Sequence, residues 1–219
     1  WRVIGIDHSK KCNLNIDSYI SIDFDRLCKD NLYCKKCIEL IKNECPNGLD
    51  ALINNAATQI LGSLESLTIK DWQKTMNVNL NSIFILTKEL LKILELVQGS
   101  VLNISSIHAS LTKSNFSAYA TSKAGLIGLS KALAVELGEK VRVNVLSPAA
   151  IATPMLEDSF LGNQQKFSDL KNFHPTKSIG AVEDVVRASI FMTDANNNFL
   201  NGAVINLDGG IGSRLYDPE

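Results

Sequence analysis

Residues 103–123 read NISSIHASLTKSNFSAYATSK and join a strand-like run to the beginning of a helix-favouring run. Tyr119 and Lys123 are four residues apart, which places both side chains on one face of a helix. An ammonium group beside a phenol stabilises phenolate, so we expect Lys123 to lower the pKa of Tyr119 from about 10. Ser106, at the end of the strand-like run, can offer a hydroxyl to the same reacting oxygen. This stretch predicts a proton-transfer site.

Strand-like and helix-like runs alternate on both sides of this stretch. We expect strands at residues 2–7, 19–23, 49–53, 100–105, 141–146 and 203–207, and helices at 27–43, 69–97, 118–138 and 182–193. The alternation predicts an α/β fold with a doubly wound parallel β-sheet and helices on both faces, in three layers. The length of 219 residues and the even composition indicate one domain over residues 1–219.

The composition is that of an ordinary globular protein and excludes several partners. Hydrophobic residues make up 45% of the chain, charged residues 21%, and the formal net charge is -1. No basic excess favours a nucleic acid partner. No apolar run is long enough to cross a membrane, and residues 1–30 lack a signal-peptide pattern, so we expect a cytoplasmic protein.

All five cysteines lie within the first 45 residues. An odd number argues against a complete disulfide framework, so we expect reduced thiols. Cys34 and Cys37 have metal-compatible spacing, but no second pair of ligands follows, and residues 27–43 have the pattern of an amphipathic helix. We therefore predict no metal site.

Small and polar residues follow directly on five of the predicted strands. They are Asp7, Asp23, residues 54–57, residues 105–106 and residues 147–148. The carboxyl ends of parallel strands lie at one edge of a sheet, which is where doubly wound folds bind ligands. We therefore expect these residues to share one site.

Several motifs, taken in order, resemble the short-chain dehydrogenase/reductase family over nearly the whole chain. They are NNAA at 54–57, MNVNL at 76–80, NISS at 103–106, Tyr119-x-x-x-Lys123, SPAAIAT at 147–153 and NLDGG at 206–210. Tyr119-x-x-x-Lys123 alone would be a weak signal, because amphipathic helices carry this spacing by chance. The order of the elements makes the resemblance specific, and it implies the Rossmann-like form of the predicted fold.

The resemblance implies hydride transfer between a nicotinamide cofactor and a small alcohol or ketone. Tyr119 would be the acid in reduction and the base in oxidation, and Lys123 would lower its pKa and hold the nicotinamide ribose. Ser106 would bind the substrate oxygen. Asn79 would hold a water that relays protons to Lys123, although an exposed helix asparagine is the alternative. A tyrosine and lysine without any role remain the alternative for the motif itself.

The resemblance also implies a set of cofactor contacts. They are Asp7, Asp23, Asn54, Ala56, Tyr119, Lys123, Pro148, Ile151 and Thr153. A carboxylate at the position of Asp7 binds both adenosine ribose hydroxyls and repels a 2′-phosphate, so we expect NAD rather than NADP, although Lys10 and Lys11 could screen a phosphate. Asp23 would contact the adenine ring, or instead cap the turn at the end of its strand.

The family's first strand, Gly-rich turn and first helix have no counterpart here, because Trp1 already stands at the start of the family's second strand. A parallel sheet without a central strand would expose ladder groups on both neighbouring strands. We therefore expect the protein to begin about 25–30 residues earlier, the span of one such unit. Ala57 and Ala149 replace usual glycines, a change we expect the backbone to accommodate.

Residues 154–180 are irregular and apolar, which predicts a lid of one or two short helices over the substrate. His108 and Met155 are candidate substrate contacts, and a loop histidine without a role is the alternative for His108. Sugars, polyols, hydroxy acids, steroid-like alcohols and acyl-carrier thioesters all remain open as substrates. The 96 residues after Lys123 leave no room for the substrate domain of a nucleotide-sugar epimerase.

Two further alternatives concern the protein as a whole. A catalytically silent dinucleotide-binding or scaffold protein is the rival to the enzyme. Family members commonly pair through their long helices, so we expect a homodimer or homotetramer. Apolar residues of the helix at 69–97 could form that interface or belong to the core: Ile83, Phe84, Leu90, Leu91 and Leu94.

Overall fold

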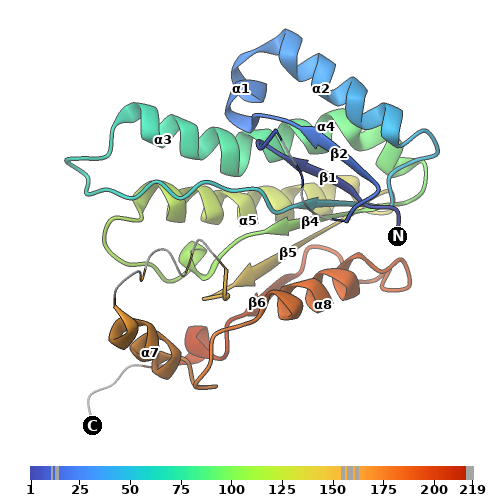
Figure 1. Ribbon diagram of the computed structural model, residues 1–219. Coiled ribbons are helices and arrows are strands. Elements are labelled where there is room, and N and C mark those ends of the chain that lie inside the picture. Colours follow the sequence, from blue (N-terminus) through green and yellow to red (C-terminus); the bar gives the residue numbers. More distant parts are fainter. Residues whose placement is uncertain (11, 13–14, 154–155, 157–159, 161–162, 216–219) are drawn as a thin grey trace.

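The computed structural model describes residues 1–10, 12, 15–153, 156, 160 and 163–215. Its strands are β1 (Ile4–Asp7), β2 (Ser18–Ser21), β3 (Ala51–Asn54), β4 (Ser100–Ile104), β5 (Arg142–Pro148) and β6 (Val204–Leu207). All six predicted strands are present, with ends shifted by a few residues, and every pairing between them is parallel. The prediction of an α/β fold with a parallel sheet is confirmed (Figure 1).

Helices connect the strands, as the alternation predicted. They are α1 (Phe24–Lys29), α2 (Asn31–Glu44), α3 (Ile69–Met76), α4 (Ser82–Glu95), α5 (Ser117–Leu137), α7 (Gln164–Phe173) and α8 (Val182–Thr193), with 3-10 turns η2 (Ile107–Ala109) and η3 (Ile211–Ser213). None of the helices in the described part of the chain is long and apolar enough to cross a membrane.

Successive side chains of the strands point to opposite faces of the sheet and pack into two separate cores. Val101 and Val143 point into a core shared with α2, α4 and α5, whereas Leu102 and Leu146 point into one shared with α8. Alternation of this kind follows from the two-residue period of a strand. Helices therefore cover both faces of the sheet, which gives the three predicted layers (Figure 1).

Two of the predicted helices are divided. Asp30 has an extended backbone (φ -122°, ψ 100°) between α1 and α2, and its carboxylate caps α2 by accepting from the backbone N–H of Tyr33. The helix predicted at 69–97 is interrupted by a π turn, η1 (Asn77–Asn81). The helix-favouring composition continues through both places, so the sequence pattern showed neither the local cap nor the single wider turn.

The interface residues proposed for this helix separate into two groups. Ile83, Leu90 and Leu94 are at most 3% exposed and belong to the core, so the core alternative holds for them. Phe84 is 46% exposed. Leu90 and Leu94 belong to the core cluster shared with α2 and the sheet, and Leu91 is partly buried against it.

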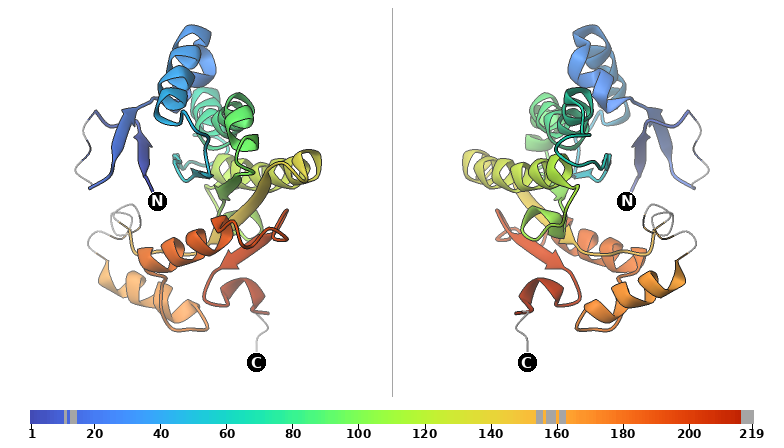
Figure 2. Two further views of the ribbon diagram at one scale, coloured as in Figure 1. Left: turned by 90° about the vertical axis from the view of Figure 1, so that its right-hand side faces the viewer. Right: turned by 90° about the vertical axis from the view of Figure 1, so that its left-hand side faces the viewer.

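The sheet is divided into two. β1 pairs only with β2, while β3, β4, β5 and β6 form a four-stranded sheet in that order. Figure 2 shows the β1–β2 pair standing apart from the larger sheet. A doubly wound sheet with its first strand central has the order 3-2-1-4-5-6, and the observed order matches it with the central place open between β1 and β3.

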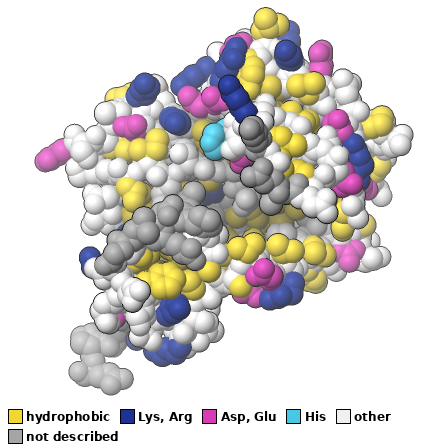
Figure 3. Space-filling model, viewed as in Figure 1, with side chains coloured by type: hydrophobic (Ala, Val, Ile, Leu, Met, Phe, Trp, Pro, Cys, Tyr) yellow, Lys and Arg dark blue, Asp and Glu magenta, His cyan; other side chains and the backbone are white. Residues whose placement is uncertain are grey.

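Apolar side chains are exposed beside this open place. Ile53 in β3 is 47% exposed, although its neighbour Leu52 is buried. Val182, Val186 and Ile190 recur at four-residue intervals along α8 and are 46–52% exposed. Figure 3 shows hydrophobic side chains gathered over α8 on this side of the molecule.

Candidate active site

The connection from β4 to α5 brings Ser106 and Tyr119 together. Ser106 follows β4 and caps the 3-10 turn η2, its Oγ accepting from the backbone N–H of His108 at 3.2 Å. The Ser106 side chain also lies near enough to the phenol of Tyr119 to lower its pKa. Ser106 is 8% exposed, so this pair lies largely out of solvent. The two groups predicted to share a reacting oxygen are therefore adjacent.

Lys123 lies on the same face of α5 as Tyr119 but does not reach the phenol oxygen. Its Nζ donates to the carbonyl oxygen of Ile104 at 2.7 Å and lies 5.8 Å from the centroid of the Tyr119 ring. Lys123 is 2% exposed, and this burial lowers its pKa to about 8. The ammonium group thus lies on one side of the Tyr119 ring and is hydrogen-bonded to the last residue of β4.

The expectation that Lys123 lowers the pKa of Tyr119 is wrong for this structure. Burial raises the pKa of Tyr119, the hydrogen bond from Ser106 lowers it in part, and the net direction is upward. Desolvation disfavours the phenolate more than one hydroxyl can favour it. The sequence could not show the direction of the Tyr119 pKa, because the four-residue spacing predicts a shared helix face and does not predict how deeply the side chains are buried.

Three more hydrogen bonds hold the start of α5. Ser105 Oγ donates to the backbone oxygen of Lys123 at 2.9 Å. Ser122 Oγ donates to the backbone oxygen of Tyr119 at 2.7 Å and accepts from Asn79. Sequence reasoning did not single out Ser122, and a small polar residue inside a helix next to a proposed catalytic lysine was the available signal.

Asn79 is fully buried in the π turn η1 and makes three hydrogen bonds. Its Nδ2 donates to the backbone oxygen of Thr58 at 2.9 Å and to Ser122 Oγ at 3.0 Å, and its Oδ1 accepts from the backbone N–H of Thr58 at 2.8 Å. The alternative of an exposed helix asparagine is therefore wrong. The side chain joins the loop after β3 to α5, and its partners do not include Lys123.

A second buried chain of polar groups runs beneath the site. Asn54 Nδ2 donates to Asn103 Oδ1, and Asn103 Nδ2 donates to Ser130 Oγ, each at 2.8 Å. All three residues are at most 7% exposed. These bonds tie the ends of β3 and β4 to α5, so the amide of Asn54 serves the scaffold. Ala56, two residues further on, is partly buried against the larger core.

Asp7 ends β1 and presents a partly exposed carboxylate. Its Oδ1 accepts from the backbone N–H of Ser9 and contacts His8 Nδ1, both at 2.9 Å. The hydrogen bond from Ser9 is the largest cause that lowers the pKa of Asp7, so the group is an anion at neutral pH. Asp23 Oδ1 caps α1 by accepting from the backbone N–H groups of Asp25 and Arg26, which is the turn-cap alternative.

The loop after β5 holds the remaining predicted cofactor contacts. Pro148 is buried at the end of β5 and pairs with Leu207. Ile151 forms a bridge with Gly180, which ties together the two ends of the predicted lid. Thr153 Oγ1 accepts from the backbone N–H of Leu156 at 3.4 Å. Met155 lies outside the described residues, and α7 is the described helix of the lid.

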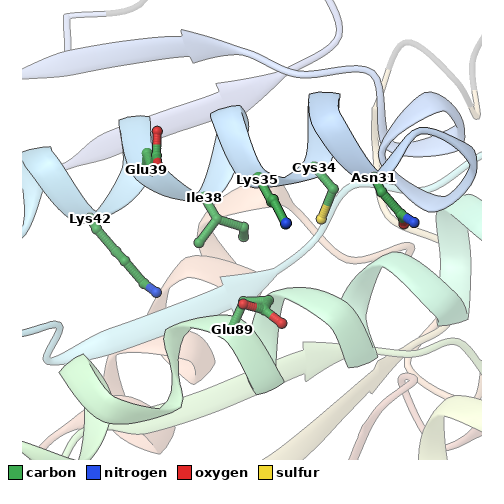
Figure 4. Close-up of a pocket in the computed structure, with 7 residues that line it drawn as sticks. All are labelled: Asn31, Cys34, Lys35, Ile38, Glu39, Lys42 and Glu89. Carbon is green, nitrogen blue, oxygen red and sulfur yellow. The ribbon is translucent and has the colours of Figure 1, made fainter.

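Two cavities accompany these elements. One of about 360 Å³ lies between α2 and α4 and contains none of the predicted site residues; its lining comprises Asn31, Cys34, Lys35, Ile38, Glu39, Lys42 and Glu89 (Figure 4). The other, of about 100 Å³, lies beside η2; its lining comprises Ile107, Ser110, Leu111, Ser147, Asn206, Asp208 and Gly212. Among the described residues, no group of three or more His, Cys, Asp or Glu side chains could hold a metal ion.

Comparison with known proteins identifies the family. Residues 28–212 match the family model described as enoyl-(acyl carrier protein) reductase. The chain is 32% identical over 165 residues to 3-oxoacyl-(acyl-carrier-protein) reductase FabG of Buchnera aphidicola, a match that covers 74% of this chain and 66% of the relative. It is 35% identical over 164 residues to the (2S)-((R)-hydroxy(phenyl)methyl)succinyl-CoA dehydrogenase subunit BbsD of Thauera aromatica, covering 74% and 64%.

Solved structures give the same answer. Ligand-free aldohexose dehydrogenase of Thermoplasma acidophilum superposes with a TM-score of 0.89 at 29% identity, over 100% of this chain and 88% of that one. ElxO with NADP bound superposes with a TM-score of 0.80 at 27% identity, over 90% and 79%. The protein belongs to the short-chain dehydrogenase/reductase family. The match spans slightly less than two thirds of the first two curated relatives.

Proposed function

We propose that the protein is an NAD(P)-dependent oxidoreductase that transfers a hydride between nicotinamide and a small alcohol or ketone. The observation that carries this is the placement of Ser106, Tyr119 and the buried ammonium group of Lys123 together at the end of β4. A phenol, a hydroxyl and an ammonium group at one strand end are what proton exchange with an alkoxide requires. A nicotinamide cofactor, when bound, supplies or accepts the hydride.

Proton transfer and stabilisation of the substrate oxygen are assigned to separate residues of the chain. In the reducing direction Tyr119 gives its phenolic proton to the developing alkoxide, and in the oxidising direction it removes that proton from the alcohol. Ser106 donates a hydrogen bond to the same oxygen and so stabilises its negative charge. Lys123 is still a cation at neutral pH and is the group that would hold the hydroxyls of the nicotinamide ribose. Asn79 keeps α5 in place, and its backbone is the part available for a proton-relaying water.

The described residues fit one side of a dinucleotide. Asp7 offers an anionic acceptor for ribose hydroxyls, and Pro148, Ile151 and Thr153 line the loop where nicotinamide would lie. Relatives of known structure include 4-hydroxyisoleucine dehydrogenase with NADH and ElxO with NADP, so the family admits both cofactors. The carboxylate of Asp7 favours NAD in this chain, because it would repel a 2′-phosphate.

The preference for NAD can be tested at Asp7. Asp7→Ala removes the repulsion, so we expect the ratio of the KM for NADP to that for NAD to fall about tenfold, the equivalent of about 1.4 kcal/mol. Asp17→Ala, at another exposed acid of the β1–β2 region, is the matched control and should leave the ratio unchanged. An unchanged ratio in the Asp7 variant would contradict the assignment.

The proposed activity is tested in two stages. Titration with NADH and NADPH, followed by nicotinamide fluorescence, measures binding before any substrate is known. Turnover is then measured across panels of sugars, polyols, hydroxy acids, steroid alcohols and acyl thioesters. Binding without turnover on any panel, or no binding of either nucleotide, would favour the silent dinucleotide-binding or scaffold protein, which is the second candidate.

We further propose that a parallel strand and a helix complete the sheet between β1 and β3. The open place in the strand order supports this, and so do the exposed side chains of Ile53, Val186 and Ile190 beside it. A Gly-rich turn between that strand and helix would hold the pyrophosphate through backbone N–H groups. The intact mass of the purified natural protein tests the idea, since a mass near 24.0 kDa would leave no residues for the unit.

The assembly is proposed to be a homodimer or homotetramer of soluble protein. Phe84 on α4 and Val135 on α5 are 46% and 85% exposed, and they offer apolar contacts on neighbouring helices. Sedimentation equilibrium of the protein and of Phe84→Glu tests this. We expect the charged variant to shift the distribution towards monomer, and a monomeric parent protein would contradict the proposal.

A further inference from the structure

The ring of Tyr119 stands against a stack of two other rings. The imidazole of His108 lies parallel to the phenyl ring of Phe116, with centroids 4.2 Å apart and planes at 6°. Both rings meet Tyr119 edge-on, at centroid distances of 5.8 Å for His108 and 6.2 Å for Phe116. Edge-to-face pairs at these separations attract one another, so the stack favours one orientation of the phenol.

The same histidine also holds Ser106. Its backbone N–H donates to Ser106 Oγ at 3.2 Å, and the Ser106 side chain in turn lowers the pKa of Tyr119. Its ring is anchored in turn, because Nδ1 lies 3.1 Å from Thr112 Oγ1. His108 therefore contacts both groups that would exchange protons with a substrate, one through its ring and the other through its backbone.

Lys123 does not perform this orienting role. Its Nζ is bound to the carbonyl of Ile104 and reaches the Tyr119 ring only at 5.8 Å from the centroid. The stack and the Ser106 side chain are thus the contacts that orient the phenol.

The charges around His108 favour its neutral form. Burial and the nearby ammonium group of Lys113, which lies 5.0 Å from the centroid of Phe116, both lower the pKa of His108. From α5, the titratable group that faces it is Tyr119. From the turn after β6, Asp208 lies across the small cavity beside η2, with its carboxylate bound to backbone N–H groups.

We propose that His108 is a positioning residue, whose ring orients Tyr119 and whose backbone N–H orients Ser106 for proton transfer. This deepens the proposed function and rests on it. Protonation would place a second cation beside Lys113 and draw the ring towards solvent, which would loosen the stack. The orientation of Tyr119 is therefore best at a pH above the pKa of His108.

The first test needs no substrate. Ultraviolet absorbance follows the ionisation of the tyrosines, and subtraction of the Tyr119→Phe curve isolates Tyr119. We expect its pKa to lie above the ordinary value of about 10 in the parent protein. His108→Ala should lower it towards that value by exposing the ring, whereas His108→Phe, which keeps a stacked ring, should not. Equal Tyr119 pKa values in the parent and His108→Ala proteins would overturn the proposal.

The second test uses turnover and its pH profile. We expect His108→Ala to lower kcat about tenfold or more with a smaller change in KM, and His108→Phe to recover part of the loss. The parent profile should fall on the acid side, below the ordinary histidine value of about 6.5. Lys113→Met should move that fall to higher pH, because it removes a charge that lowers the pKa of His108.

The outcomes separate the two hypotheses. A role in packing alone would change the melting temperature and leave the acid limb in place in Lys113→Met, and that result would overturn positioning by His108. Absence of turnover in the parent protein counts against the proposed function only, since the tyrosine titration is independent of it.

Discussion

The catalytic side and the cofactor side of the predicted binding edge are held very differently. Ser106, Tyr119 and Lys123 lie where β4 meets α5, bound to the sheet by buried hydrogen bonds. Asp7 lies on a two-stranded sheet that pairs with no other described strand, and its contacts are exposed. The first arrangement is determined by residues within β3 to β5 and their helices. Among the described strands, the second rests on the pairing of β1 with β2 alone.

The largest expected effect comes from the catalytic side. Tyr119→Phe removes the proton donor while keeping the ring against His108 and Phe116, so we expect kcat to fall about 10³-fold, within the range of general acid–base catalysis. The melting temperature should be retained and serves as the control. A variant with the turnover of the parent protein would show that the phenol does not transfer the proton.

The buried amide of Asn79 tests how much the scaffold depends on one side chain. Asn79→Leu leaves the backbone groups of Thr58 without partners, so we expect a loss of about 2–4 kcal/mol in the free energy of unfolding. Asn81→Ala is the matched control, because Asn81 is exposed and bonds only to Asn77 among the contacts found, and it should cost less than about 0.5 kcal/mol. Urea denaturation measures both. Equal losses would refute the bracing role of Asn79.

The pKa of Lys123 makes a prediction about stability and pH. Its value of about 8 in the folded protein lies below the ordinary 10.5, so the unfolded chain binds more protons between these pH values. The Lys123 contribution to stability is therefore unfavourable below about pH 8 and is relieved as pH rises to 10.5. The parent protein should gain about 1–3 kcal/mol over Lys123→Met across this window. A constant difference would contradict a desolvated lysine.

The smallest effect is expected at the open place in the sheet. Ile190→Ser changes a side chain that is 52% exposed, so we expect a loss below about 0.5 kcal/mol in residues 1–219. Leu90→Ala, at a fully buried position of the other face, should cost about 2–5 kcal/mol and provides the contrast. If a strand and helix complete the sheet in the natural protein, Ile190→Ser should become markedly more costly there.

The sequence predicted the strands, and the proximity of Ser106, Tyr119 and Lys123, better than the contacts around them. The strands follow from short apolar runs that end in Asp7, Asn54 and Ser105, and all of them form. The site follows from the spacing of Ser106, Tyr119 and Lys123 together with the order of the motifs. Both signals depend on residues that are close in the sequence, so they hold although the strands form two separate sheets.

What the sequence could not predict depends on depth and on partners far along the chain. The direction of the Tyr119 pKa follows from its burial, and the three bonds of Asn79 join residues 21 and 43 positions apart. The carboxylate of Asp23 caps the turn, as the alternative predicted, because it accepts hydrogen bonds from two backbone N–H groups within the next three residues. No spacing rule contains such information.

The π turn at Asn77–Asn81 has a consequence for insertions and deletions. One wide turn holds a residue more than an α-helix would, so the residues before and after it are out of phase by about 100°. Deleting a single residue there would join α3 and α4 into one regular helix and turn Asn79 away from Thr58 and Ser122. A deletion that makes the helix regular would thus remove the hydrogen bonds through which Asn79 holds α5. We therefore expect this segment to tolerate substitutions better than insertions or deletions.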